Sequence, residues 1–150
     1  MIKKFLIAIV SLVVAGVIGY YLSNLVHDKA VPPEALPGEV NSFLTKYFKE
    51  EKIAFSKMDR DFLKISYEVI LSDGTKLEFN SSGEWKEING HHKKIPDGII
   101  PDMIALKIAE LYRQSYAVKA EKDGRNLEIE LSNGLELKFD KNFNLLSIDR

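Results

Sequence analysis

The sequence predicts an α+β fold made of two tandem repeats, each one helix followed by a four-stranded antiparallel meander, after an N-terminal transmembrane or signal helix. Two segments place apolar residues at helical spacing, and several others alternate apolar and polar residues as half-buried strands do. The second half of the chain also repeats the first. One helix over one antiparallel sheet leaves the other sheet face exposed, and two such units can extend one sheet of roughly eight strands.

The first 27 residues determine the expected compartment. Lys3 and Lys4 precede an uncharged, mostly apolar run over 5–26. Positive charge before an apolar run keeps the N-terminus in the cytoplasm, so the rest of the chain is expected to be exported, on the periplasmic or extracellular side. The run is closer to the roughly 20 residues that cross a bilayer than to the roughly 7 to 15 of a signal peptide. This length favours a membrane anchor over 1–27, with a cleaved signal peptide as the alternative.

The first repeat is expected over 39–90, after a linker. Residues 28–38 hold three prolines and few apolar residues, which predicts an extended tether. The following apolar residues have the spacing of one helical face: Val40, Phe43, Leu44, Tyr47 and Phe48. Strands are expected over 53–58, over 63–71 and around Leu77 and Phe79, with a last strand at 84–88. Asp73-Gly74 supplies the hairpin turn because these residues tolerate positive φ angles.

The second repeat is expected over 91–150. A helix with Ile104, Ile108, Leu111 and Tyr112 on one face precedes strands joined by Asn133-Gly134. Alignment of 65–90 with 125–150 gives identical residues at Glu68/Glu128, Leu71/Leu131, Ser72/Ser132, Gly74/Gly134, Leu77/Leu137, Phe79/Phe139 and Ile88/Ile148. The helices are offset by four residues more than the hairpins, so the first repeat needs a longer connection near 56–62.

These motifs resemble the PepSY-like proteins, which are described as beta-lactamase-inhibitor-like. The resemblance rests on Leu36-Pro37, Tyr67-Glu68-Val69, Ser72-Asp73-Gly74-Thr75, Leu77-Glu78-Phe79-Asn80, Gly83-Glu84-Trp85 and Ile95-Pro96, and on their counterparts in the second half. It covers about 34–149 and implies an exported protein with a helix-plus-meander fold like that of the beta-lactamase inhibitor. It implies no particular function. Phe143 departs from the pattern, because it stands where the repeat places a glycine.

The composition argues against most kinds of chemistry. The chain has no cysteine, which excludes disulfides, thiolate metal sites and thiol catalysis. Its 21 basic and 22 acidic residues are interspersed, so no basic footprint for nucleic acid is present. The adjacent His91 and His92 have no patterned third ligand, and no serine is paired with a histidine and a carboxylate. We therefore expect no enzyme activity, no cofactor and no metal.

Three apolar residues are the candidate binding site. Simple strand alternation places Ile70, Trp85 and Leu145 on the sheet face away from the helices. The alternatives are that a β-bulge reverses the register, or that the tether or the other repeat covers Trp85. Exposed apolar patches rimmed by charge are typical of protein-binding surfaces. The resulting hypothesis is a non-enzymatic module that binds an unidentified protein or peptide, with inhibition of an envelope hydrolase as one form. The alternative is a structural or sensory extracytoplasmic domain, held in an assembly by an uncleaved N-terminal helix.

Overall fold

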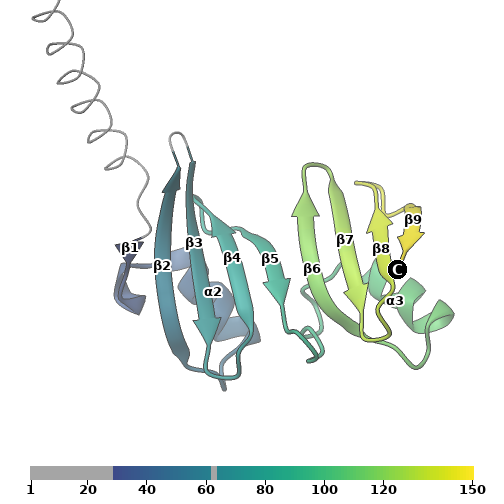
Figure 1. Cartoon of the computed structure of the whole chain (residues 1–150), viewed down its shortest axis with the longest axis horizontal. Coiled ribbons are helices and arrows are strands. Elements are labelled where there is room, and N and C mark those ends of the chain that lie inside the picture. The colour runs from purple at the N-terminus through teal and green to yellow at the C-terminus, as the bar shows by residue number, and fades with distance from the viewer. Residues whose placement is uncertain (1–28, 62–63) are drawn as a thin grey trace, which may run out of the picture.

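The computed structural model describes residues 29–61 and 64–150 (Figure 1). The predicted anchor or signal peptide over 1–27 lies outside the described residues. Within the described part, no helix combines the length and the apolar character needed to cross a membrane.

In the described part of the chain, nine antiparallel strands form one sheet whose strand order is the order of the chain. The strands are β1 (Lys29–Ala30), β2 (Ile53–Asp61), β3 (Lys64–Leu71), β4 (Lys76–Asn80), β5 (Trp85–Asn89), β6 (Ala117–Asp123), β7 (Asn126–Leu131), β8 (Glu136–Phe139) and β9 (Leu145–Asp149). The two halves meet where β5 pairs with β6, through Glu87 with Glu121, Ile88 with Ala120 and Asn89 with Lys119. The predicted α+β class and the hairpin turns are confirmed, and the sheet has one strand more than expected.

Two α-helices, α2 (Gly38–Tyr47) and α3 (Asp102–Leu111), cover one face of this sheet behind the strands of Figure 1. Each helix begins directly after a proline, Pro37 or Pro101. The ψ of each proline is near 140°, so the proline itself is extended and the helix starts at the next residue. Glu39 and Asp102 place a carboxylate in the first turn, where the helix dipole favours negative charge. We call the covered side of the sheet the helix face and the other side the open face.

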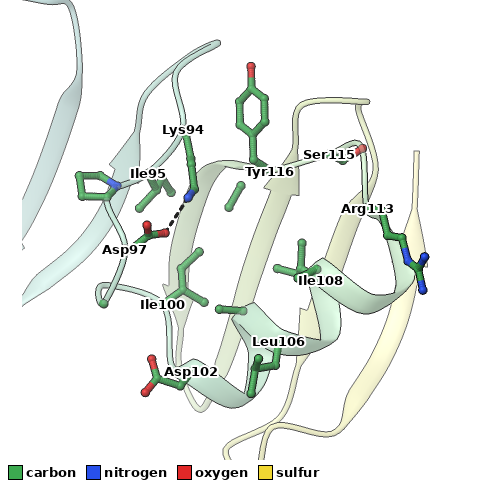
Figure 2. A pocket seen from close by; sticks show the side chains of 15 residues that line it. Lys94, Ile95, Asp97, Ile100, Asp102, Leu106, Ile108, Arg113, Ser115 and Tyr116 are labelled. Carbon is green, nitrogen blue, oxygen red and sulfur yellow. Dashed lines mark ion pairs between the residues drawn. The ribbon is translucent and has the colours of Figure 1, made fainter.

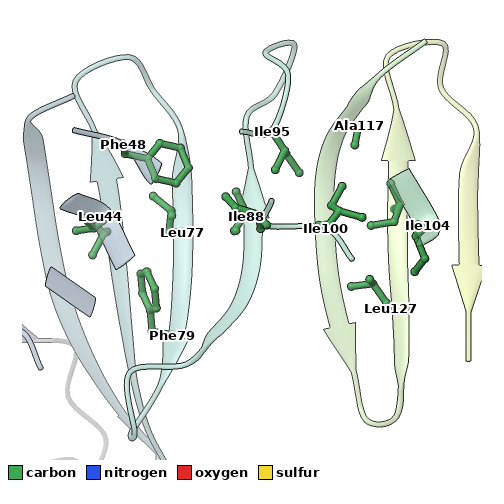
Figure 3. Close-up of a cluster of buried hydrophobic side chains, with 14 of the residues drawn as sticks. Leu44, Phe48, Leu77, Phe79, Ile88, Ile95, Ile100, Ile104, Ala117 and Leu127 are labelled. Carbon is green, nitrogen blue, oxygen red and sulfur yellow. The ribbon is translucent and has the colours of Figure 1, made fainter. Parts of the chain in front are cut away.

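The core lies between the helices and the helix face, and it continues across the joint between the halves (Figure 3). Ile88 of β5 is fully buried, and Ile95 and Ile100 belong to the same cluster. The largest fully buried side chains are Phe79, Phe139, Leu71, Leu77, Ile88, Ile104, Ile129, Leu131 and Leu137. Because burial of one such side chain contributes about 1.5 to 3 kcal/mol, the continuous core holds the halves together as one body.

The prediction that 28–38 is a free tether is wrong for the described part of that segment. Lys29 and Ala30 form β1 and pair with β2, and Pro33–Ala35 forms the short 3-10 helix η1. Leu36 is 5% exposed, and the Ser56 hydroxyl donates to the Val31 carbonyl at 2.7 Å. Prolines are compatible with this packing because β1 is an edge strand.

Candidate functional site

Ile70 lies on the open face, as predicted. It is half-buried on β3, where it pairs with Phe55 on one side and Lys76 on the other. Phe55 is 43% exposed, so the pair is a small apolar patch at one end of the open face.

Trp85 does not lie on the open face, so this part of the predicted site is wrong. The register shifts between Glu78, which pairs with Glu87, and Phe79, which pairs with Trp85. Lys86 is therefore the extra residue of a β-bulge, which turns Trp85 to the helix face beside the buried Phe79. There the indole packs against the core, and the Lys122 ammonium lies 4.0 Å from its ring centroid.

Leu145 is displaced to the helix face for the same reason. In β9, Lys138 pairs with Ser147 and Phe139 with Leu145, so Leu146 is the extra residue of an equivalent bulge. Leu145 is 37% exposed at the edge of the sheet. Ile70, Trp85 and Leu145 therefore do not form one surface.

The open face is dominated by charge instead. Cross-strand pairing lines up a row of glutamates across β3 to β7, which we call the glutamate row: Glu68, Glu78, Glu87, Glu121 and Glu128. Lys76 lies 3.3 Å from Glu68 and 2.8 Å from Glu78, and Lys119 lies 3.7 Å from Glu87 and 2.8 Å from Glu121.

The ends of the glutamate row are also neutralised by lysines. Lys138 pairs with Glu128, and Lys57 lies 3.9 Å from Glu68. The hydrogen bond to Glu78 is the main reason that the pKa of Lys76 is raised, so this lysine keeps its charge. Alternating charges of this kind offset the repulsion between neighbouring glutamates and leave no sizeable apolar surface on the row.

The histidine pair lies in an exposed turn after β5, where the His91 N–H donates to Asn89 at 2.8 Å. The residues 29–61 and 64–150 contain no group of three or more acidic, histidine or cysteine side chains that could hold a metal ion.

A groove with a volume of about 780 Å³ lies beside α3. Figure 2 shows Ile100 and Ile108 on opposite sides of it, with Tyr116 at one end. Its lining is mainly apolar: Ile95, Pro96, Ile100, Ala105, Leu106, Ile108, Ala109, Tyr116 and Ala117, with Lys94, Asp97, Gly98, Asp102, Arg113 and Ser115 at the margins. We call this opening the α3 groove.

Leu106 carries the apolar surface of the groove onto the exposed side of α3, whereas Met103 and Leu111 do not line the groove. Met103, Leu106 and Leu111 are 59%, 69% and 62% exposed. At the margin of the groove, Lys94 and Asp97 form an exposed ion pair of 2.7 Å, and Tyr116 donates its hydroxyl hydrogen to the His92 carbonyl at 3.2 Å. The site therefore joins a concave wall to an exposed side chain of α3, Leu106.

The α3 groove was not among the predicted site residues. Its signal in the sequence is the excess of apolar residues over 102–111, because Leu106 lies off the buried stripe of Ile104 and Ile108. A helix with one buried face needs no second set of apolar side chains for its own packing.

The chain matches the family described as "Putative beta-lactamase-inhibitor-like, PepSY-like" over residues 65–147. This match covers more than half of the sequence. The chain belongs to the PepSY-like family. The resemblance stated from the sequence motifs is thereby confirmed, and no match is found among the curated proteins.

Three solved structures of Bacteroides proteins share this fold. A "putative calcium-regulated periplasmic protein" from Bacteroides thetaiotaomicron is 39% identical with a TM-score of 0.79, covering 82% of this chain and 97% of its own. A putative periplasmic protein of the DUF2874 family from Bacteroides vulgatus is 37% identical with the same TM-score and the same coverage. A second putative periplasmic protein of that organism, of unknown function, is 35% identical with a TM-score of 0.78, covering 83% and 100%. These PepSY-like relatives support an exported localisation for the chain.

Proposed function

We propose that this PepSY-like protein is an exported, non-enzymatic binding module and that the α3 groove docks an amphipathic helix of a partner protein. The observation that carries the proposal is Leu106 of α3, which is 69% exposed beside a concave, mainly apolar wall. Exposed apolar surface of this extent on a folded domain is typical of an interaction site.

A helix is the favoured occupant because of the shape of α3. Ala105 and Ala109 are small residues one turn apart, and Leu106 stands beside them as a ridge. Small residues let a second helix approach closely, and its aliphatic residues at i, i+3, i+4 and i+7 can then pack around Leu106.

The open face is the less favourable docking surface. Its glutamates and lysines are already paired, and burial of such pairs under a partner would cost desolvation free energy. Calcium, named for one of the solved relatives, is not part of the proposed activity, because each glutamate of the row faces a lysine ammonium that repels a divalent cation.

We also infer that the two halves are copies of one unit. Both helices follow a proline, and both last strands carry a bulge at the same position, Lys86 in β5 and Leu146 in β9. Duplication leaves one copy free to change its exposed positions while the other retains a polar surface.

The docking proposal is tested by site-specific photo-crosslinking in the envelope of living cells. A photoreactive amino acid is placed in the full chain at Leu106, and the matched control carries it at Ser42, the equivalent exposed position of α2. We expect the probe at 106, and not the probe at 42, to cross-link one protein, with the attachment point mapping to an amphipathic helix.

Affinity measurements with the identified partner complete the test. Leu106→Glu should weaken binding at least about tenfold, whereas Ser42→Glu should leave it unchanged. Inhibition of an envelope hydrolase is tested in the same experiment if the partner is such an enzyme. Equal cross-linking from both positions, or loss of binding with Ile70→Glu but not with Leu106→Glu, would contradict the proposed surface.

A further inference from the structure

A second pocket lies on the helix face near the tips of the β6–β7 and β8–β9 turns, with a volume of about 310 Å³. It is separated from the α3 groove by the chain just before α3: Ile99 and Pro101 line this pocket, and Ile100 between them lines the groove. Its other lining residues are Trp85, Lys122, Gly124, Arg125, Asn126, Leu127, Asp140, Lys141 and Phe143. We call it the Trp85 pocket.

Three cations converge on the Trp85 pocket without ion-pair partners. Within 29–61 and 64–150, neither Lys122 nor Arg125 nor Lys141 has a carboxylate within 4.0 Å. The Lys122 ammonium rests on the Trp85 ring, and its partial desolvation lowers the pKa of this lysine against the weaker opposing effect of Glu84. A partly desolvated cation gains more than a hydrated one when it meets an anion.

Asp140 is the single carboxylate in the lining, and its oxygens are already used. They accept hydrogen bonds from the Asn142 N–H, the Asn144 N–H and the Asn144 side-chain amide at 2.8 to 2.9 Å. The same bonds, led by that of the Asn144 side chain, lower the pKa of Asp140. With Asp140 ionised, the three cations still leave the pocket with positive charge in excess.

The first half lacks the three cations of this pocket. The repeat places Met58, Ile65 and Ser81 where the second half has Lys122, Arg125 and Lys141. A side chain at Gly83 would lie 2.7 Å from the Glu39 Cβ, so the first turn packs directly on α2. Phe143 is accommodated at the corresponding position with φ 64°, so the second turn is not packed as closely on α3.

We propose that the Trp85 pocket binds an anionic group carried on an apolar body, of the kind represented by a medium-chain aliphatic carboxylate. Lys122 and Arg125 provide the charge-assisted hydrogen bonds that a carboxylate accepts. The Trp85 ring, Leu127 and Phe143 provide apolar walls for the hydrocarbon part. A convergent set of cations beside aromatic and aliphatic walls is the arrangement expected of such a ligand site.

Trp85 is the only tryptophan of the chain, so its fluorescence and its indole N–H signal in NMR report on this pocket alone. The test is a titration of the full chain with octanoate, with octan-1-ol as the neutral analogue and inorganic phosphate as the anion without an apolar part. We expect a saturable shift of the indole signal with octanoate, and binding at least about tenfold weaker for octan-1-ol and for phosphate.

Variants test whether octanoate binding depends on the cations of the pocket or only on the overall charge of the protein. Lys122→Gln with Arg125→Gln should weaken octanoate binding at least about tenfold, whereas Lys86→Gln, which removes an exposed charge next to Trp85 outside the pocket, should leave it unchanged. Retention of the fold is checked from the thermal midpoint of each variant. Equal binding of octanoate and octan-1-ol, equal binding of phosphate and octanoate, or undiminished binding by the double variant would each overturn the proposal.

Discussion

The outer faces of α2 and α3 differ although the two helices occupy equivalent places on the sheet. With Pro37 aligned to Pro101, the half-buried Asn41 and the exposed Ser42 and Thr45 of α2 correspond to Ala105, Leu106 and Ala109 of α3. The buried residues are alike, with Val40 and Leu44 replaced by Ile104 and Ile108. The fold therefore constrains the inner face of each helix, and the outer face is free to acquire a function.

The region equivalent to the α3 groove is smaller in the first half, where a pocket of about 290 Å³ lies beside 30–33 and 53–56. The Asn41 side-chain amide donates two long hydrogen bonds, to Pro33 at 3.5 Å and Leu36 at 3.4 Å, which tie α2 to η1. Ala105 at the same place in α3 cannot donate, and the α3 groove opens there. The exchange of a polar side chain for a methyl group at this position is therefore one difference between the two surfaces.

The largest expected effect tests whether the core stabilises the protein equally in its two halves. Phe79→Ala should lower the free energy of unfolding by about 4 kcal/mol and Phe139→Ala by about 3 kcal/mol, because both side chains are fully buried. The difference is expected because Phe79 meets the Phe43 ring edge-on at 5.6 Å, whereas Lys107 stands at the place of Phe43 in α3. Urea unfolding of the full chain measures both values.

A double-mutant cycle that includes Phe43→Leu isolates the contribution of the ring contact between Phe43 and Phe79. In that background the costs of Phe79→Ala and Phe139→Ala should become equal within about 0.5 kcal/mol. A persistent difference would locate the asymmetry elsewhere in the core.

The next largest expected effect is a difference in stability between variants of the turns before β5 and β9. Gly83→Ala should cost about 2 to 3 kcal/mol, because φ at Gly83 is +83° and the added Cβ would lie 2.7 Å from the Glu39 Cβ and 3.3 Å from the Val40 nitrogen. The mirror change, Phe143→Gly, should stay within about 1 kcal/mol of the wild type, because relief of the positive φ offsets the lost packing of the ring. Chemical denaturation midpoints compare the two variants.

A similar cost for both changes would mean that the second turn is packed as tightly as the first. That result would also weaken the comparison from which the Trp85 pocket is inferred.

The smallest expected effect distinguishes the two hairpin turns by pH. Burial raises the pKa of Asp73, but hydrogen bonds from the Thr75 N–H, Lys93 and the Thr75 hydroxyl outweigh it and leave the pKa below its usual value. Its stabilisation is therefore complete above about pH 4, the unfolded value, and is lost as the pH falls through the lower folded pKa. Asp73→Asn should cost about 1 kcal/mol at pH 7 and almost nothing near pH 2.

Asn133 holds the corresponding place in the second hairpin and accepts the Leu135 N–H at 3.1 Å without a charge. Asp73→Asn should therefore keep the turn and lose only the ionic part, which lies in the 2.9 Å pair with Lys93. Unfolding measured at pH 7 and near pH 2 gives both values. An equal cost at the two pH values would show that the carboxylate charge does not stabilise the turn.

Most of the fold follows from short-range patterns in the sequence. The helical spacing after Pro37 and Pro101, the alternation along β3, and the Asp73-Gly74 turn are local properties, and each occurs where the patterns predicted it. The expected longer connection in the first half is the β2–β3 hairpin, where β2 has 9 residues and β6 has 7. The packing of 29–38 could have been predicted too, because Val31-Pro32 precedes Leu36-Pro37 at the same spacing as Ile95-Pro96 precedes Ile100-Pro101.

The predicted site failed because it assumed regular alternation through a bulge. Trp85 and Ile88 are three residues apart, as are Leu145 and Ile148, and an odd spacing brings both members of a pair to one face only if an extra residue is inserted. The repeated odd spacing was a usable signal. The α3 groove is harder to predict, because it depends on how the chain over 94–100 lies beside α3.

The agreement between strand order and chain order bears on how this protein folds after export. Each strand pairs with the strand that precedes it, and only the β1–β2 and β5–β6 connections contain a helix. Pairing between successive strands keeps the contact order lower than pairing between distant strands would, and lower contact order is associated with faster folding. A chain that emerges N-terminus first from a translocation channel can add one strand at a time to a growing edge, without waiting for distant segments to arrive.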